Sequence, residues 1–514
     1  MSLPIVQTLV ASALILALFA WNRRASRLGK RLPGPKGWPF IGSLFDLPDN
    51  CEWEKFTEWS RTYKSDIIGY TRLGTSVIVI SSRQVANDLL EKRSSIYSDR
   101  PRMPMLNELA GMDWNFGFMP YGKLWKDHRT VFAKEMNPIA YKHHRAQQYE
   151  AGCSLLRRLL DTPENFMGHL RFMASSLVMS TGYAITIKDE HDPYVEIAER
   201  TLPAQSSAGI SARYWVDLWP ILKYVPSWAP GAGFKREAKE WRKWVTAMPE
   251  VAFRATKKGI VEGSAASSIV SRLLDRISED EDYVYQEHLI RGCAGTMIAA
   301  GSDTTVSVLG TFLLAMTLHP EIQKKAQKAM DNVTSGERLP DFSDYESIPY
   351  IDAVMKEVHR WHGVNPLGLP HRLMQDDEYN GYHLPTGSVV FANIWEMQHD
   401  PTLFPEPYEF KPDRFMNADG SLNVALAKDS EIAFGFGRRA CPGREMANAQ
   451  VWMMMALILS SFDIRPAEDG NGKPIIPVAD YHWGMLTFPK EFQCLICPRS
   501  PKSVELIRAH STAL

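Results

Sequence analysis

The sequence has few cysteines and almost no net charge. Six Cys in 514 residues are too few and too widely spaced for the disulfide framework of a secreted scaffold. Lys and Arg number 58 against 59 Asp and Glu, a net charge of −1. This balance gives no support for nucleic acid as a partner, because such proteins carry a basic excess. The composition, 45% hydrophobic and 23% charged, excludes a disordered or collagen-like protein.

Charged side chains are also missing from the first 22 residues. Residues 4–21 are mostly apolar, and as a helix they would span about 27 Å, close to the hydrocarbon thickness of an endoplasmic reticulum bilayer. Basic residues follow at once, at positions 23, 24, 27, 30 and 31. Because positive charge stays on the cytosolic side, the pattern predicts a single-pass anchor with the body of the protein in the cytosol. The alternative is a cleaved signal peptide, which would carry its basic residues first.

The chain is expected to contain three segments. Residues 1–22 are the predicted N-terminal membrane anchor. Residues 23–42 form a basic linker rich in Pro and Gly, which stiffens the exit from the membrane. Residues 43–514 form one folded domain.

A regular alternation of strands with helices is absent, so a parallel-sheet α/β fold is not expected. Residues 71–80 include the β-branched run Val77–Ile80, which predicts a strand. Long helical patterns occupy residues 137–161, 288–318, 320–334, 352–362 and 444–461. The predicted fold class is therefore mainly α with small β-sheet patches. No G-x-G-x-x-G follows a predicted strand, so any electrons must come from a separate protein.

The motifs with chemical meaning centre on Cys441. Residues 434–443 read FGFGRRACPG, which matches F-x-x-G-x-R-x-C-x-G at every fixed position. The glycines let the backbone turn tightly beside a flat ligand, and amides at the start of the next helix can hold the sulfur as a thiolate. A single axial thiolate on haem iron favours O–O cleavage. The alternative is a buried, inert cysteine, which would not require the neighbouring glycines and arginines.

This loop resembles the haem-ligand loop of the cytochrome P450 superfamily, and the resemblance extends over nearly the whole chain. The stretches DLWPILKYVP at residues 217–226 and FQC at residues 492–494 resemble those of microsomal, fungal members that tailor natural products. The resemblance implies a cytochrome P450 fold in which residues 43–514 are the haem-thiolate catalytic domain. It also implies haem b with Cys441 as the iron ligand, and contact of Phe434 and Gly301 with the cofactor. The residues expected to bind the haem propionates are Trp125, Arg129, Arg372 and Arg439.

Asp303 and Thr304 lie within a long apolar helical pattern. An acid and a hydroxyl are costly to bury there without a role, and a Thr hydroxyl can bond a helix carbonyl and bend the helix. In the resembled family this segment crosses the oxygen side of the haem. The resemblance therefore implies that Thr304 and Asp303 are catalytic and manage protons during oxygen activation. The alternative is a core helix that happens to be rich in Ser and Thr.

The short motif Glu-x-x-Arg occurs three times, at residues 58–61, 357–360 and 505–508. A surface ion pair is the default interpretation of such a motif. Only Glu357 and Arg360 have the placement that the family shows relative to Cys441. The resemblance implies that Arg414 completes a buried Glu–Arg–Arg cluster with a structural role.

Two further sequence features give weaker indications, one about cysteine chemistry and one about the substrate. Cys494 and Cys497 form a C-x-x-C without a second pair, in a strand-like setting, and are expected to be inert thiols. Met and aromatic residues crowd residues 103–119 and 214–219. They favour a hydrophobic substrate, although ordinary core packing explains them equally well.

Taken together, the sequence predicts a membrane-anchored haem-thiolate monooxygenase of the endoplasmic reticulum. It would insert one oxygen atom of O2 into a hydrophobic small molecule, with hydroxylation of a terpenoid, an indole or a polyketide in fungal secondary metabolism as the expected reaction. The resemblance implies electrons from NADPH through a separate NADPH–cytochrome P450 reductase, with cytochrome b5 as a second candidate donor. Two alternatives stay open: a haem-thiolate isomerase or dehydratase, which often lacks the Asp-Thr pair, and a non-catalytic haem-binding protein.

Overall fold

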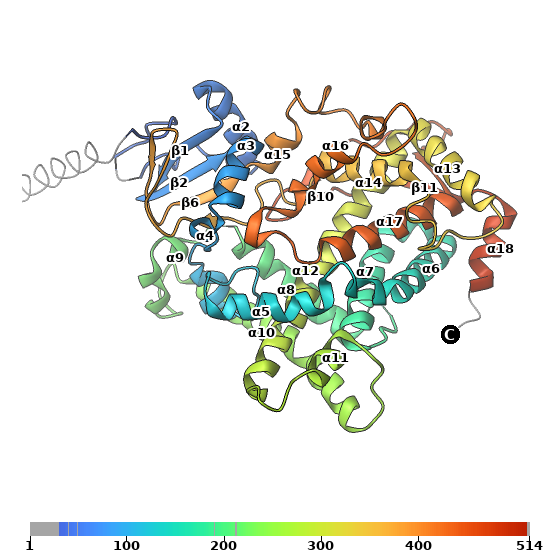
Figure 1. Ribbon diagram of the computed structural model, residues 1–514, viewed down its shortest axis with the longest axis horizontal. Coiled ribbons are helices and arrows are strands. Elements are labelled where there is room, and N and C mark those ends of the chain that lie inside the picture. Colours follow the sequence, from blue (N-terminus) through green and yellow to red (C-terminus); the bar gives the residue numbers. More distant parts are fainter. Residues whose placement is uncertain (1–29, 40, 49, 190, 211–212, 511–514) are drawn as a thin grey trace, which may run out of the picture. The chain divides into compact units, whose positions relative to one another are not determined.

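The computed structural model describes residues 30–510, except residues 40, 49, 190 and 211–212 (Figure 1). The predicted anchor, residues 1–22, and the first part of the linker, residues 23–29, lie outside the described residues and stay predictions. The chain divides into two compact units. The sheet unit comprises the chain up to Asp99 with Pro370–Asn393, and the helical unit comprises Arg100–Leu369 with the chain from Ile394 onward.

The sheet unit contains a four-stranded sheet in the order β1-β2-β6-β3. Its strands are β1 (Ile67–Arg72), β2 (Thr75–Ile80), β6 (Val389–Ala392) and β3 (His371–Arg372). Strand β2 is antiparallel to β1 and parallel to β6. The remaining elements of the unit are α2 (Glu52–Tyr63), α3 (Arg83–Ala86), η1 (Asn87–Lys92), α4 (Ser94–Tyr97), β4 (Asp377–Tyr379) and β5 (Tyr382–Leu384).

The predicted strand at residues 71–80 is wrong at its start. The segment contains the end of β1, a reversal and then β2. Leu73 and Gly74 have φ angles of 48° and 83°, and this left-handed conformation turns the chain between the two strands. The β-branched run Val77–Ile80 is buried in β2, as the sequence predicts.

The helical unit contains most of the helices (Figure 1). They are α5 (Lys123–Met136), α6 (Arg145–Asp161), α7 (Phe166–Tyr183), α8 (Pro193–Ala208), α9 (Trp215–Leu218), α10 (Gly233–Val261), α11 (Ile269–Asp275), α12 (Tyr283–Leu318), α13 (Pro320–Thr334), α14 (Pro349–Trp361), α15 (Ile394–Gln398), α16 (Val424–Ser430), α17 (Arg444–Ser461) and α18 (Pro501–Ala509).

Short helical turns and small sheets complete the helical unit. The turns are η2 (Pro104–Leu109), η3 (Ala140–His144), η4 (Pro163–Asn165), η5 (Pro220–Tyr224), η6 (Pro412–Phe415), η7 (Glu431–Phe434) and η8 (Gly437–Arg439). The strands are β7 (Phe462–Glu468), β8 (Pro474–Ile475), β9 (Tyr481–His482), β10 (Phe488–Pro489) and β11 (Cys494–Pro498). The expectation of a mainly helical chain with small sheet patches is confirmed, and among the described strands only β2 and β6 pair in parallel.

Helix boundaries follow local capping. The predicted helices at residues 320–334 and 444–461 coincide with α13 and α17. The predicted helix at 137–161 is wrong over its first turns, because the Asn137 side chain accepts the amides of Ile139 and Ala140 at 3.0 Å and starts the separate turn η3. Helix α12 begins five residues before the prediction, where the Asp282 side chain accepts the amide of Tyr285 at 3.1 Å. Helix α14 begins three residues early, at Pro349.

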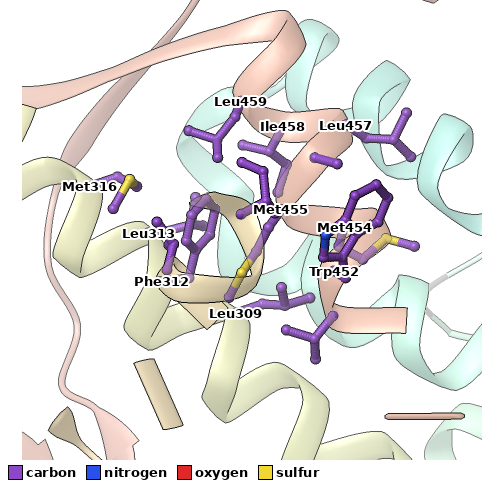
Figure 2. Close-up of a cluster of buried hydrophobic side chains, with 14 of the residues drawn as sticks. Leu309, Phe312, Leu313, Met316, Trp452, Met454, Met455, Leu457, Ile458 and Leu459 are labelled. Carbon is purple, nitrogen blue, oxygen red and sulfur yellow. The ribbon is translucent and has the colours of Figure 1, made fainter. Parts of the chain in front are cut away.

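Helices α12 and α17 form the centre of the core (Figure 2). Leu309, Phe312 and Leu313 of α12 and Trp452 and Ile458 of α17 are all fully buried in one cluster. Each such side chain contributes roughly 1.5–3 kcal/mol on burial. By length and composition α12 is also the one described helix that could cross a membrane, but 78% of its apolar stretch is buried inside the protein. Packing in the core therefore accounts for its hydrophobicity.

A buried charge cluster ties α14 to the segment before α16. Glu357 and Arg360 have fully buried side chains, and the Arg360 Nε donates to the Glu357 carboxylate at 2.6 Å. The Arg414 Nε donates to the same carboxylate at 3.1 Å. The remaining Arg360 donors bond the carbonyls of Gln398, Pro407 and Glu409. The predicted Glu–Arg–Arg cluster is confirmed, and its buried charges are satisfied.

We expect Glu357→Ala to destabilise the protein by roughly 3–5 kcal/mol, because it leaves two arginines without their shared carboxylate, one of them fully buried. The matched control is Glu58→Ala. Glu58 opens another copy of the motif, but its side chain is 61% exposed and bonds Lys55. Its loss should cost at most about 0.5 kcal/mol. Thermal unfolding of both variants checks this, and equal shifts would contradict the structural role of Glu357.

Candidate active site

The loop before α17 is closed by its own backbone. The Cys441 amide donates to the Phe434 carbonyl at 2.8 Å. Gly435 and Gly437 between them have φ angles of 79° and 54°, which residues with a Cβ rarely adopt. The Phe434 ring lies 5.2 Å from the His359 ring of α14, in a T-shaped contact. The fold thus presents Cys441, which is exposed, at the N-terminal end of α17.

Two opposing influences act on the Cys441 thiol. Although the residue is exposed, the protein atoms packed around its sulfur raise its pKa, which disfavours the thiolate. The Gly443 amide and the positive charges of Arg129 and Arg444 lower the pKa. Arg129 lies close because its Nη1 donates to the Ala440 carbonyl at 3.0 Å. The protein therefore supplies groups that favour the anion, as expected of a thiolate ligand.

Helix α5 brings three of the predicted residues together beside this loop. The Arg439 guanidinium lies 4.2 Å from the Trp125 ring centroid, and the Arg129 guanidinium lies 5.7 Å from the same ring. Trp125 is buried. Arg439 also donates to the Met119 carbonyl at 2.8 Å. Two cations are thus held against one aromatic side chain, next to Cys441.

Arg372, the fourth predicted propionate residue, belongs to the sheet unit. It lies in β3, where its amide donates to the Asp99 carbonyl at 2.9 Å and its Nη1 lies 3.2 Å from the Asp99 carboxylate. The side chain is 49% exposed.

Arg100 is a buried arginine that the sequence analysis missed. It is 5% exposed, and it donates to the carbonyls of Gly117 and Leu369 at 3.0 and 2.8 Å. Arg439 donates to Phe116 and Met119 in the same short segment. Two arginines therefore fix the backbone of residues 116–119. The sequence contains no spacing signal for Arg100, because its burial depends on contacts distant along the chain.

Helix α12 is less deeply buried near its middle than on either side. Residues 292–299 and 305–317 are buried, whereas Ala300 is exposed and Gly301, Asp303 and Thr304 are only partly buried. The Thr304 hydroxyl donates to the Ala300 carbonyl at 2.7 Å, as predicted. Burial raises the pKa of Asp303 to about 6. A core helix with an uncovered stretch and a carboxyl of raised pKa is typical of a functional site.

Gly301 has a second role besides the predicted one. A Cβ at this position would come 3.1 Å from Val178 Cγ2 of α7. The glycine therefore also permits close packing between α12 and α7.

The described residues fit a haem. They contain no group of three His, Cys, Asp or Glu side chains that could hold a metal ion. Cys441 can supply one thiolate ligand to an iron whose remaining ligands a porphyrin would supply. The clustered Arg129 and Arg439 suit its propionates, and Ala300 and Gly301 suit its flat face. For Cys494 of the C-x-x-C pair, burial raises the pKa of the thiol to about 12, which agrees with an inert thiol.

Part of the apolar set predicted at residues 103–119 and 214–219 comes together with Leu369 and Met485, whereas Phe116 and Met119 belong to another cluster and Trp215 and Trp219 are exposed. Met103, Met105, Met112, Phe118 and Met485 are buried in one cluster within the helical unit. Trp114, Tyr214 and Leu369 pack against it and are partly buried. These side chains come from segments far apart in the sequence, so the cluster is a tertiary feature.

Comparison with known proteins identifies the family. A family profile described as Cytochrome P450 matches residues 32–495. The chain is 42% identical over 477 residues to cytochrome P450 monooxygenase 98 of Postia placenta, covering 92% of this chain and 91% of that one. It is 38% identical over 502 residues to tryptamine 4-monooxygenase of Psilocybe cyanescens, covering 97% and 99%. It is 40% identical over 477 residues to cytochrome P450 monooxygenase ple1 of Rhodocybe pseudopiperita, covering 93% and 91%.

The fold and the thiolate loop are therefore those of a haem-thiolate oxidoreductase. The chain belongs to the cytochrome P450 family, and it is a monooxygenase by its similarity to these fungal enzymes over nearly its whole length. The expected resemblance is confirmed. Membership of the family implies haem with a cysteine thiolate ligand.

We expect Asp303→Asn to stabilise the fold at neutral pH. The carboxyl pKa is about 6 in the folded protein against 3.8 as its ordinary value, so above pH 6 the folded state carries a poorly solvated charge. The gain should be at most roughly 3 kcal/mol at pH 8, and it should decline as the pH falls through 6 and disappear at a pH below the ordinary value of 3.8, where the acid is protonated in both states.

Thermal unfolding of Asp303→Asn at several pH values checks this expectation. Asp280→Asn, at an exposed position, is the control and should show no such dependence. A gain that is constant with pH would contradict the assignment of a raised pKa.

Proposed function

We propose that this monooxygenase hydroxylates a hydrophobic small molecule of fungal secondary metabolism, of the terpenoid, indole or polyketide class. The observation that carries the proposal is the exposed Cys441 beside clustered cations, combined with the uncovered stretch of α12 that presents Asp303 and Thr304. The apolar cluster around Met105 and Phe118 supports a hydrophobic substrate. The fungal relatives support a substrate from fungal secondary metabolism, and one of them is named for an indole, tryptamine.

Each residue has a role in this proposal. Cys441 binds haem iron as a thiolate, and the bound haem supplies oxygen activation. Arg129, Arg439 and Trp125, with Arg372, bind and orient the propionates. Phe434 and Gly301 contact the cofactor. Thr304 holds a proton at its Oγ1 and Asp303 exchanges one with solvent, which its pKa of about 6 permits near neutral pH.

Electrons would come from NADPH through NADPH–cytochrome P450 reductase, with cytochrome b5 as a second donor. Lys123, Lys126 and Lys134 of α5, with Arg438 and Arg444 beside the thiolate loop, supply positive charge for an acidic partner. Part of this charge is already compensated within the chain, because Lys123 pairs with Asp127 and Arg444 pairs with Glu431 and Glu445. We expect the remaining attraction to be sensitive to salt.

The enzyme would be anchored in the endoplasmic reticulum membrane by residues 1–22, with its catalytic domain in the cytosol. Several large apolar side chains around α9 and η5 are exposed, and this supports a second contact with the bilayer surface. They are Trp215, Trp219, Ile221, Tyr224 and Trp228.

Replacement of the thiolate tests the cofactor assignment. The reduced protein with CO should show the Soret position of thiolate ligation, and Cys441→Ser should lose it while Cys494→Ser keeps it. Cys494 is the matched control because it lies in β11 with a thiol that stays protonated. A Soret band at the histidine-ligated position, unchanged in Cys441→Ser, would refute the assignment and favour a non-catalytic haem protein.

A substrate panel tests the reaction class. The ferric protein in membranes is titrated with terpenes, indoles and polyketides, and a low-to-high-spin shift identifies the class that displaces water from the iron. With the compound so found, Thr304→Ala should lower product per NADPH by roughly 10-fold or more and release peroxide instead, since the positioned proton is lost. Unchanged coupling would contradict the role of Thr304. Turnover of a peroxide substrate without NADPH would favour the isomerase alternative.

A further inference from the structure

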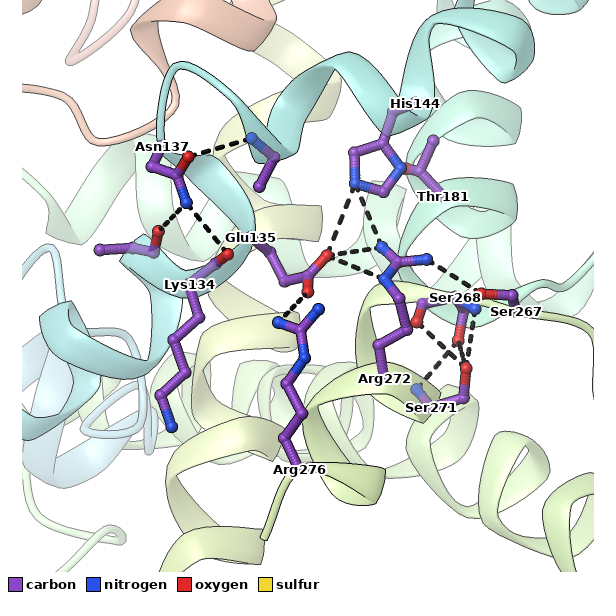
Figure 3. Close-up of polar contacts among 12 residues, drawn as sticks. Lys134, Glu135, Asn137, His144, Thr181, Ser267, Ser268, Ser271, Arg272 and Arg276 are labelled. Atoms are coloured by element: carbon purple, nitrogen blue, oxygen red, sulfur yellow. Dashed lines mark hydrogen bonds and ion pairs between the residues drawn. The ribbon is translucent and has the colours of Figure 1, made fainter.

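A buried carboxylate, Glu135, lies in the last turn of α5, and neither the thiolate loop nor the apolar cluster includes it (Figure 3). Its side chain is 2% exposed. Arg272 approaches it with Nη2 at 2.5 Å and Nε at 3.1 Å, and the Arg276 Nη1 donates to its other oxygen at 2.8 Å. Two arginines separated by one helical turn therefore hold one buried acid of α5.

Helix α11 is built to present these arginines. A reciprocal pair of bonds between Ser268 and Ser271 caps its first turn, at 3.1 and 2.8 Å. The Arg272 Nη1 also donates to the Ser267 hydroxyl at 3.1 Å. The segment that leads into α11 thus helps to hold the Arg272 guanidinium in place.

The neighbouring histidine does not compete for the carboxylate. The His144 Nε2 lies 3.9 Å from Glu135 and 3.3 Å from the Arg272 Nη2. Burial and the charge of Arg272 lower the pKa of His144 to about 4. The imidazole is therefore neutral at physiological pH, and it accepts from Arg272. Among these side chains Glu135 thus carries the one negative charge, beside the positive charges of Arg272 and Arg276.

The other end of α5 is held on the same side of the helix. The Tyr285 hydroxyl of α12 donates to the Asp127 carboxylate at 2.6 Å. With 3.6 residues per turn, Asp127 and Glu135 lie roughly 160° and 120° around the helix from Arg129, and Glu135 lies roughly 9 Å further along the axis. Anchors at both ends, which point in other directions than Arg129, fix how far α5 can rotate or slide.

We propose that Glu135, held by Arg272 and Arg276, is a positioning residue for the haem site: it fixes the rotation of α5, and thereby places Arg129 and Trp125 against the thiolate loop. The link to Cys441 is short, since Arg129 donates to the Ala440 carbonyl. Supporting groups of this kind tune a metal centre without touching it. The inference rests on haem binding at Cys441.

The test compares Glu135→Gln with a matched control, Asp344→Asn. Asp344 is also a buried carboxylate, 5% exposed, and Arg338 holds it in a bidentate pair at 2.6 and 2.7 Å, but it lies between α13 and α14. Glu135→Gln removes the charge that two arginines hold, and Asp344→Asn removes the charge that Arg338 holds, so thermal unfolding should shift in both. Haem loss, measured by transfer to excess apomyoglobin, should be about 10-fold faster only in Glu135→Gln. The fraction of its CO complex with the thiolate Soret position should also fall.

Two further variants separate a positioning role of Glu135 from a general loss of folding. Glu135→Asp retains the charge and should recover part of the haem retention. If Glu135→Gln does not fold, Arg276→Gln removes the partner that is 47% exposed and should still speed haem loss. Haem loss unchanged in these variants, or raised equally in Asp344→Asn, would overturn the inference. A wild-type protein without haem would instead contradict the proposed function.

Discussion

The site depends on holding Cys441 as a thiolate anion in surroundings that favour the neutral thiol. The protein atoms packed around the sulfur raise the pKa of the thiol, and the Gly443 amide and two arginines act in the other direction. Of these, Arg129 belongs to α5, a helix remote in sequence. The thiolate loop is consequently not an independent motif. Its chemistry requires that α5 be held in a fixed place, and much of the polar structure around α5 can be understood in that light.

The apolar core provides the second requirement, which is rigidity. Helices α12 and α17 share a densely packed cluster that includes Phe312 and Trp452 (Figure 2). On α12 the less buried stretch at residues 300–304 comes just before the part of the helix that packs in this cluster. The Cys441 loop comes just before α17 in the same way. Because packed interiors resist small displacements, one core fixes both α12 and the helix that follows the Cys441 loop. The energetic penalty of a partly buried Asp303 is tolerated within this frame.

Much of this arrangement could be predicted from the sequence, because its strongest signals are local. The loop around Cys441, the Thr304 hydroxyl bonded to its own helix and the limits of α13 and α17 depend on residues that are neighbours in the chain. The start of α6 was mispredicted because one side chain, Asn137, caps a separate turn. Arg100 and Glu135 escaped notice for a different reason. Each is an ordinary charged residue in sequence, and only tertiary contacts bury it.

The three copies of Glu-x-x-Arg show why burial, rather than the pattern, decides what a charged motif does. At residues 58 and 508 the exposed side chains bond other partners, Lys55 and Asp161, since in water one ion pair is worth little more than another. Glu357 and Arg360 have no contact with water, so an unpaired charge would be severely destabilising and the pair must form. The same reasoning applies to Glu135. A carboxylate placed in the interior forces arginines toward it, and α11, which carries Arg272 and has Arg276 as its C-cap, then becomes fixed relative to α5.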